Sequence, residues 1–244
     1  PLHLRLLSPQ AMRQPALLLG LLLAVVLVRL PSFHPHFVAT DEAVYLAGAE
    51  RILDGKDLYA DIWDNKPPVI YWVYAVVAAP FGLEHGLTAM RVFSILYIYV
   101  IGVLLAQLLS NYRMFSGRFY LPSFLFALFV SVPWYTLEMN AELLMTLPMV
   151  VGLILLARET IEERRNWRNR LLIGVLCGLM IAIKYQGVFN ALALVLGYLI
   201  VGRVRVRNIA TLLIGMALTL GAIVMGLYLN GNLAAYWDVG LVYN

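Results

Sequence analysis

Long runs of hydrophobic residues, separated by short polar segments, dominate the chain. A helix that crosses the hydrocarbon core of a bilayer needs about 20 mostly apolar residues. Five runs meet this requirement, and they cover residues 14–33, 92–110, 119–136, 141–158 and 209–229. The pattern therefore predicts an all-α fold, a polytopic bundle of transmembrane helices.

One further apolar stretch is too long for a single crossing. It fills the 32 residues between Arg170 and Arg203 and is interrupted by Lys184-Tyr185-Gln186-Gly187. Arginine clusters lie at both ends, and if both are cytoplasmic the number of crossings between them is even. We therefore expect a tight hairpin, with arms over residues 171–184 and 187–202. Each arm would rise only about 21–24 Å, less than the roughly 30 Å of the hydrocarbon core, so Lys184 should lie recessed below the outer surface.

A shorter apolar segment, Val69–Leu83, decides the membrane topology. If it were counted as a crossing, every later loop would be placed on the opposite side of the membrane. Pro80 and Gly82 close this segment. When it is left out, 12 of the 18 Lys and Arg residues but only 3 of the 14 Asp and Glu residues are cytoplasmic, which gives +9 inside and −5 outside. Cytoplasmic loops are enriched in Lys and Arg. We therefore predict about seven spans, a cytoplasmic N-terminus, and an interfacial or re-entrant segment at Val69–Leu83.

Composition excludes a soluble globular protein. Hydrophobic residues make up 62% of the 244 residues and charged residues 13%, against about 45–50% and about 25% in soluble domains. The net charge of +4 follows from the arginines of the cytoplasmic loops, so we expect no nucleic-acid partner. The only cysteine, Cys177, rules out an intrachain disulfide and a cysteine metal cluster.

We expect a single membrane domain over residues 1–244, with the first span at 14–33, an outer loop at 34–87 and spans 2–7 within 88–230. The basic start and the apolar run Ala16–Val28 are also compatible with a signal peptide. No small-residue cleavage site follows this run, which favours a retained signal anchor.

Polar residues are scarce and form a cluster in residues 34–68, which hold seven of the 14 acidic and three of the 18 basic side chains. Thr40 is a favourable N-cap, and Gly55 suits the end of a helix that runs to about Leu53. One face of this helix is apolar, as in a helix that lies on the membrane surface. The sequence therefore predicts a juxtamembrane helix in the first outer loop.

Asp41 and Glu42 fall in the first turn of this helix. Free backbone N–H groups and the helix dipole stabilise negative charge there, so Asp41 is a candidate catalytic base. Adjacent helical residues point about 100° apart, so one carboxylate can act while the other orients. From spacing alone, an ordinary helix start is the alternative.

Lys66 precedes Pro67 and Pro68, which favour an extended backbone and stiffen the end of the loop. A compact cation held there suits a lipid phosphate. The alternative is an interfacial lysine that snorkels to the membrane surface. Weaker phosphate candidates are Arg51, Lys56 and Arg91.

Glu138 and Glu142 lie four residues apart around the expected start of a span, so we expect them to share a helical face at its outer end. A charge deep in the bilayer costs about 2.5–3.5 kcal/mol on insertion scales, so it usually faces a wet cavity or a partner. Lys184 is the candidate partner. A structural ion pair and a catalytic cavity both remain open.

Several of these residues together resemble a known family. Asp41-Glu42-x-x-Tyr45 after the first span, then Gly55, Tyr59, Asp61 and Asn65-Lys66-Pro67-Pro68-x-x-Tyr71-Trp72, resemble the first outer loop of GT-C glycosyltransferases. The likeness is to the dolichyl-phosphate-mannose protein mannosyltransferase and aminoarabinose (lipid A) transferase group. It covers residues 14–110 well and extends more loosely to about 230 through Glu142 and Lys184-Tyr185.

The resemblance implies transfer of a sugar from a polyprenyl-phosphate carrier to an acceptor hydroxyl on a lipid, glycan or protein, at the outer face and with inversion. Asp41 would match the catalytic base, with Glu42 in support. Lys66 would hold the carrier phosphate. The further residues assigned to binding of the lipid-phosphate donor are Tyr45, Arg51 and Tyr59. The residues assigned to the cavity lining are Glu138, Glu142 and Lys184. A multi-pass protein of a bacterial plasma membrane is the expected setting.

Two departures limit this resemblance. Family members usually have more spans and often an outer soluble domain, so the chain resembles the N-terminal part of a longer architecture. Asn65 replaces the acidic residue of some relatives, so a metal bound there is not carried over. His34 and His36 lack identifiable further ligands; we therefore assign no metal site and no required cofactor, although a divalent ion stays possible. The alternatives in other classes are a transporter or lipid-carrier flippase and a non-catalytic scaffold.

Overall fold

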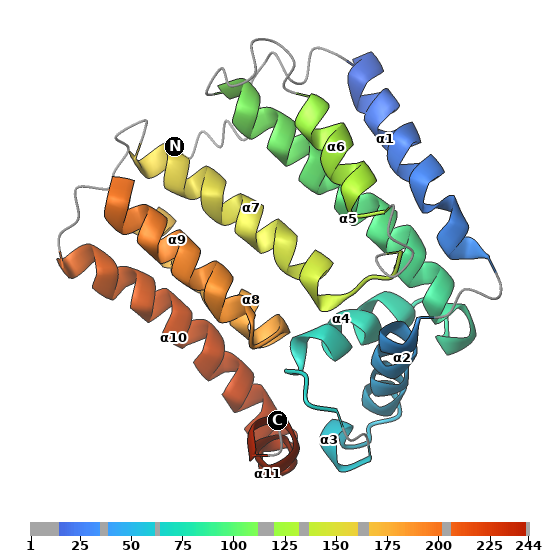
Figure 1. The fold of residues 1–244 in the computed structure, drawn as a ribbon. Coiled ribbons are helices and arrows are strands. Elements are labelled where there is room, and N and C mark those ends of the chain that lie inside the picture. Colours follow the sequence, from blue (N-terminus) through green and yellow to red (C-terminus); the bar gives the residue numbers. More distant parts are fainter. Residues whose placement is uncertain are drawn as a thin grey trace. The chain divides into compact units, whose positions relative to one another are not determined.

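The computed structural model describes residues 15–34, 39–61, 64–111, 120–131, 137–160, 166–201 and 206–242. These residues form helices and no strand (Figure 1). The helices are α1 (Pro15–Arg29), α2 (Thr40–Leu53), α3 (Leu58–Asp61), α4 (Val69–Ala78), α5 (Gly86–Asn111), α6 (Leu121–Phe129), α7 (Ala141–Thr160), α8 (Trp167–Ile183), α9 (Gly187–Val201), α10 (Val206–Leu229) and α11 (Leu233–Tyr236), with the 3-10 turns η1 (Leu30–Phe33) and η2 (Leu83–His85) and the π-helical turn η4 (Trp237–Val242). The all-α expectation is confirmed.

The chain divides into two compact units. Unit 1 consists of Pro1–Glu42 and Thr88–Asn140, and unit 2 of Ala43–Leu87 and Ala141–Asn244. The boundary falls within α2, directly after Glu42.

Unit 1 is built from α1, most of α5, and α6. Leu21 of α1 is fully buried and packs against Gly102 of α5. A Cβ atom added at Gly102 would lie 3.0 Å from the Leu21 side chain. The Ser123 hydroxyl of α6 donates to the carbonyl oxygen of Gly102 at 2.7 Å. Glycine at position 102 therefore lets both neighbouring helices approach the backbone of α5.

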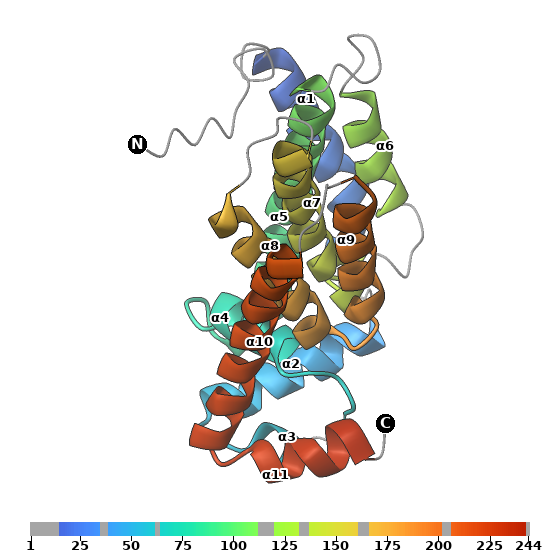
Figure 2. The ribbon, with the colours of Figure 1, turned by 90° about the vertical axis from the view of Figure 1, so that its left-hand side faces the viewer.

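Unit 2 is a bundle in which α8 packs against both α7 and α10 (Figures 1 and 2). Gly174 and Gly178 of α8 face α10, where a Cβ atom at Gly174 would overlap the carbonyl oxygen of Leu212. In the other direction, a Cβ atom at Gly215 would overlap the carbonyl oxygen of Leu171. Small residues at such spacing are the usual way for membrane helices to pack closely.

A buried polar network ties together one end of this bundle. The Arg170 guanidinium of α8 pairs with Glu159 of α7 and donates to Asn208 Oδ1 of α10 at 2.6 Å. The Tyr198 hydroxyl of α9 donates to Glu159 at 3.3 Å. All four helices therefore contribute a side chain to one network, which satisfies a buried cation with an acidic partner and an amide.

Most of the predicted spans correspond to observed helices. Within the described ranges, four helices are long and apolar enough to cross a membrane: Pro15–Phe33, Leu83–Ser110, Ala141–Glu159 and Asn208–Leu229. The helix predicted to begin at residue 92 begins at Gly86. For the predicted span 119–136, the described part is the nine-residue α6, and residues 132–136 lie outside the described ranges. The total of seven crossings stays a prediction.

The predicted hairpin in the long apolar stretch is confirmed. α8 ends at Ile183 and α9 begins at Gly187, so the chain breaks at Lys184-Tyr185-Gln186. A Cβ atom at Gly187 would overlap the backbone of Met180. Only glycine allows the two arms to meet so closely at the turn.

A helix is also present where the sequence predicts one after the first span, as α2, while its position at the outer face of the membrane stays a prediction. It ends at Leu53, and Gly55 in the turn after it has a φ of +70°, in the left-handed region that favours glycine. The Lys56 N–H group then donates to the carbonyl oxygen of Arg51 at 2.8 Å. The apolar segment after this loop forms α4, which has ten residues and would rise about 15 Å, half of a crossing.

Candidate functional site

The two adjacent carboxylates at the start of α2 have different surroundings. Glu42 is fully buried, and its carboxylate lies 3.6 Å from Arg91 Nη2 of α5, within unit 1. Burial raises the pKa of Glu42, although the charges of Arg91 and Arg29 and the backbone of Met139 oppose this shift. Asp41 is only partly buried. The arrangement supports Glu42 as the residue that fixes the first turn and leaves Asp41 as the more accessible carboxylate.

Glu138 does not share a helical face with Glu142, so this expectation is wrong. α7 begins at Ala141, and Glu138 lies in a bend before it. The i, i+4 relationship requires both residues in one helix. Glu138 is 8% exposed, next to Leu137, whose carbonyl oxygen accepts a hydrogen bond from the buried Arg29 at 2.7 Å.

Lys66 lies at the end of the loop between α3 and α4, in unit 2. Pro67 and Pro68 after it are buried and lead directly into α4. The Tyr59 hydroxyl of α3 donates to the carbonyl oxygen of Lys66 at 2.9 Å. The Lys66 Nζ atom lies 3.3 Å from Asp64 Oδ1, and the Lys66 side chain is 23% exposed. Lys66 is therefore fixed at its backbone and at its ammonium group while it stays accessible.

Asp64 joins Lys66 to the core of the loop. Its second carboxylate oxygen accepts a hydrogen bond of 2.5 Å from the Tyr71 hydroxyl of α4. Burial raises the pKa of Tyr71, and the hydrogen bond to Asp64 raises it further. Tyr71 therefore remains a neutral O–H donor to this carboxylate in the physiological pH range.

Tyrosine rings surround this hydrogen bond. Tyr71 makes edge-to-face contacts with Tyr45 at 5.8 Å and with Tyr59 at 6.3 Å between ring centroids. Tyr45 and Tyr59 are 1% and 2% exposed. In this structure the two tyrosines assigned to donor binding therefore support the loop from within. Arg51, in the last turn of α2, is partly exposed.

A second lysine lies at the tip of the α8–α9 hairpin. Lys184 forms the expected ion pair with Glu142, in the first turn of α7. The side chains are 20% and 57% exposed. The pairing confirms Lys184 as the partner of Glu142, while their part in catalysis stays a prediction.

A chain of tyrosines connects the two lysine positions within unit 2. The Tyr59 ring contacts the Tyr236 ring of α11, with 5.0 Å between centroids. The hydroxyl groups of Tyr236 and Tyr185 are 3.0 Å apart, and Tyr185 donates to the carbonyl oxygen of Gly240 at 2.8 Å. Since Tyr59 holds Lys66 and Tyr185 follows Lys184, three aromatic rings link the Lys66 loop to the hairpin tip.

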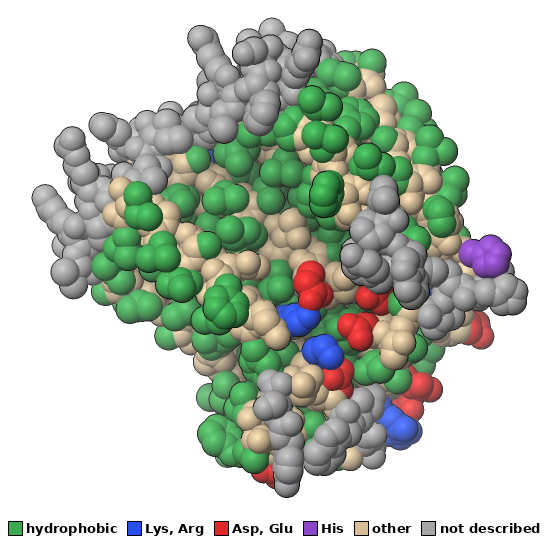
Figure 3. Space-filling model, in the orientation of Figure 1, with side chains coloured by type: hydrophobic (Ala, Val, Ile, Leu, Met, Phe, Trp, Pro, Cys, Tyr) green, Lys and Arg blue, Asp and Glu red, His purple; other side chains and the backbone are tan. Residues whose placement is uncertain are grey.

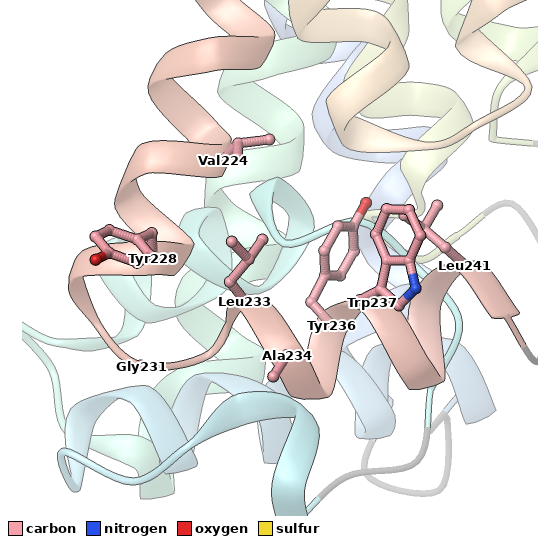
Figure 4. A pocket seen from close by; sticks show the side chains of 8 residues that line it. All are labelled: Val224, Tyr228, Gly231, Leu233, Ala234, Tyr236, Trp237 and Leu241. Atoms are coloured by element: carbon pink, nitrogen blue, oxygen red, sulfur yellow. The ribbon is translucent and has the colours of Figure 1, made fainter.

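An open groove of about 750 Å³ lies beside this chain (Figure 4). It lies where α11 follows the end of α10 (Figure 2). None of the lining residues carries a charge: Val224, Tyr228, Gly231, Leu233, Ala234, Tyr236, Trp237 and Leu241. Over α7, α9 and α10 the exposed side chains are also mainly hydrophobic (Figure 3). The groove can contact a hydrocarbon chain, and Tyr236 is the residue that it shares with the tyrosine chain.

Sequence reasoning missed Asp64, Tyr185 and Tyr236 as parts of this site. A signal for Asp64 exists, because in an extended segment residues two apart point to the same side and Asp64 lies two residues before Lys66. For the contact between Tyr59 and Tyr236 the sequence holds no local signal.

Comparison with known families decides what kind of protein this is. The family model described as dolichyl-phosphate-mannose-protein mannosyltransferase matches residues 65–228, two thirds of the chain. The chain belongs to this family. Membership in this mannosyltransferase family supports a membrane glycosyltransferase of the GT-C type and an integral membrane location. No curated protein and no solved structure shows a significant match.

The part of the chain that matches the mannosyltransferase family begins at Asn65. It therefore includes Lys66, Glu138, Glu142 and Lys184, whereas the residues of the proposed site that precede it are Asp41, Glu42, Tyr45, Arg51, Tyr59 and Asp64. The roles of these earlier residues rest on the local geometry and on the sequence resemblance.

Proposed function

We propose that the protein transfers a sugar from a polyprenyl-phosphate-linked donor to an acceptor hydroxyl group at the outer face of the membrane. The observation that carries this proposal is Lys66, an accessible cation fixed by Tyr59, Asp64 and a proline pair at the start of the family match. A fixed ammonium group suits a phosphate that carries negative charge. The apolar groove at the end of α10 supports a donor with a hydrocarbon chain.

In the proposed reaction the acceptor oxygen attacks the anomeric carbon from the face opposite the carrier. The bond between the anomeric carbon and the phosphate oxygen breaks, so the configuration inverts and polyprenyl phosphate leaves. Asp41 takes the proton of the acceptor hydroxyl as general base. Lys66 stabilises the negative charge that develops on the leaving phosphate.

The other site residues act around this reaction. Glu42 holds the first turn of α2 through its contact with Arg91. Arg51 is a further candidate for the donor phosphate, and Tyr45 and Tyr59 support the Lys66 loop. Glu138, Glu142 and Lys184 are proposed to line the cavity, in a topology of seven spans with a cytoplasmic N-terminus. The sugar acceptor is a lipid, a glycan or a protein.

The test is transfer from a synthetic polyprenyl-phosphate sugar in membranes that contain the protein. We expect Asp41→Asn to lower kcat by about 10²- to 10⁴-fold, because a general base contributes this much. Asp54→Asn removes a carboxylate of the same loop that pairs with Lys56 on the surface, and it serves as the matched control. Undiminished transfer by a folded Asp41→Asn variant would remove the proposed base.

The same preparation separates the alternatives. A transporter or flippase that uses the Glu142–Lys184 pair would move the carrier across proteoliposomes without forming a covalent product. A scaffold would lose only stability when Asp41 and Lys66 are neutralised. Either result would overturn the proposed transferase activity.

A further inference from the structure

Asp64 contacts the proposed phosphate-binding lysine directly, and neither the sequence resemblance nor the family match assigns it a role. The Asp64 side chain is only 14% exposed, yet it lies between two polar groups of different kinds. One oxygen faces Lys66 Nζ at 3.3 Å, and the other accepts the Tyr71 hydroxyl at 2.5 Å. The two contacts fix both oxygens of one carboxylate.

We propose that Asp64 is a positioning residue that holds the Lys66 ammonium group at the place of the donor phosphate. This inference rests on the proposed function, in which Lys66 binds that phosphate. An ammonium group has three N–H donors, and Asp64 uses one of them, so two remain for phosphate oxygens. Lysine is long and flexible, and the carboxylate removes much of this freedom before the donor arrives.

The anchor of Asp64 comes from Tyr71, not from solvent. Tyr71 is fully buried, and its ring is packed by Tyr45 and Tyr59. Tyr59 also binds the backbone of Lys66. The lysine and its carboxylate are therefore attached to one rigid aromatic cluster, which keeps their geometry constant.

A second Asp–Lys ion pair in the same predicted outer loop has no such tyrosine anchor among the described residues. Asp54 and Lys56 are also two residues apart, with 3.0 Å between Asp54 Oδ2 and Lys56 Nζ. Their side chains are 44% and 48% exposed, so solvent screens the pair. The sequence spacing is the same, and the difference lies in the burial and in the tyrosine anchor.

The carboxylate has two opposing effects on catalysis. It orders the ammonium group, which favours the reaction, but it also competes with the phosphate for the same cation. Removing its charge should therefore tighten binding of the lipid phosphate while it slows the reaction. A purely structural role would not produce this combination.

The experiment measures two quantities for each variant in membranes or detergent: kcat for sugar transfer, and the Kd of polyprenyl phosphate without a sugar. For Asp64→Asn we expect kcat to fall by about 10- to 100-fold through lost positioning, and Kd to fall by about two- to fivefold, the strength of a partly exposed ion pair. Tyr71→Phe keeps the ring and the carboxylate charge, so its kcat should fall while Kd stays the same. Asp54→Asn should change neither quantity.

Lys66→Ala separates this inference from the proposed function. If Lys66→Ala weakens polyprenyl phosphate binding but Asp64→Asn changes neither kcat nor Kd, the role of Asp64 is overturned and the phosphate site stands. A lower kcat of Asp64→Asn with an unchanged or weaker Kd would reduce Asp64 to a structural residue, which also overturns the proposal. If Lys66→Ala leaves Kd unchanged, the proposed phosphate site itself fails.

Discussion

At the residue scale, the proposed site residues of each unit include one group that is buried and one that remains more accessible. Glu42 is enclosed beside Arg91, while its neighbour Asp41 is only partly buried. Lys66 is held by Asp64 yet remains 23% exposed. In each case a buried carboxyl group fixes a position next to a more accessible charged group. Buried side chains with fixed partners hold the neighbouring accessible charged groups in place.

The burial of Glu42 predicts a pH dependence of stability. Because the pKa of Glu42 is raised in the folded state above the ordinary value of 4.5, the folded protein keeps this proton to higher pH than the unfolded chain. Its contribution therefore becomes less favourable as pH rises from about 4.5 through the folded pKa. Glu42→Gln cannot titrate. We expect the Tm of Glu42→Gln relative to the unmodified protein to increase between pH 4.5 and 7 in detergent. A constant or decreasing difference would show that the attraction of Arg91 outweighs burial.

At the scale of elements, glycine determines how the helices of unit 2 meet. Gly174 and Gly178 let α8 approach α10, and Gly187 allows the hairpin turn. These helices hold Lys184 and Tyr185 at the tip between α8 and α9. The packing of small residues at a distance from the site therefore sets where the second lysine lies.

Substitution of these glycines should be costly where the helices touch. A Cβ atom in Gly174→Ala would overlap the backbone oxygen of Leu212, and overpacking typically costs about 1–3 kcal/mol. Gly221→Ala on α10 is the matched control, because no atom lies within 4 Å of its added Cβ atom; alanine there should stabilise the helix by about 1 kcal/mol. Thermal unfolding of the purified variants measures both. Equal Tm values for the two variants would contradict the close packing of α8 and α10.

At the scale of the whole molecule, charge asymmetry predicts which side of the membrane each loop faces. The proposed topology places the first loop outside and the Arg158–Arg170 segment in the cytoplasm. The native cysteine, Cys177, is 2% exposed, so the protein is suited to labelling of single introduced cysteines.

A membrane-impermeant maleimide tests this topology in intact cells. Asp57 in the first loop and Arg168 at the start of α8 are both exposed. We expect Asp57→Cys to react in intact cells and Arg168→Cys only after permeabilisation, since positively charged loops stay in the cytoplasm. The unmodified protein is the control for Cys177. The reverse labelling pattern would place the proposed site on the cytoplasmic side.

The sequence was sufficient where local pattern determines structure. The bounds of α2, the break at Lys184 and the pairing of Lys184 with Glu142 follow from capping residues, apolar run length and the cost of an unpaired charge in a membrane. It failed for Glu138, because α7 begins only at Ala141, directly after the N-cap candidate Asn140, so Glu138 precedes the helix that holds Glu142. The tyrosine chain depends on contacts between distant parts of the chain, which no local pattern encodes.

The contact between Tyr59 and Tyr236 also has a consequence for biosynthesis. The two rings lie 177 positions apart in the chain. At a synthesis rate of about 5–20 residues per second, Tyr236 follows Tyr59 by roughly 9 to 35 seconds. During this interval the Lys66 loop lacks one of the aromatic rings that pack against it. The loop therefore reaches its final packing only when the segment around Tyr236 has been inserted.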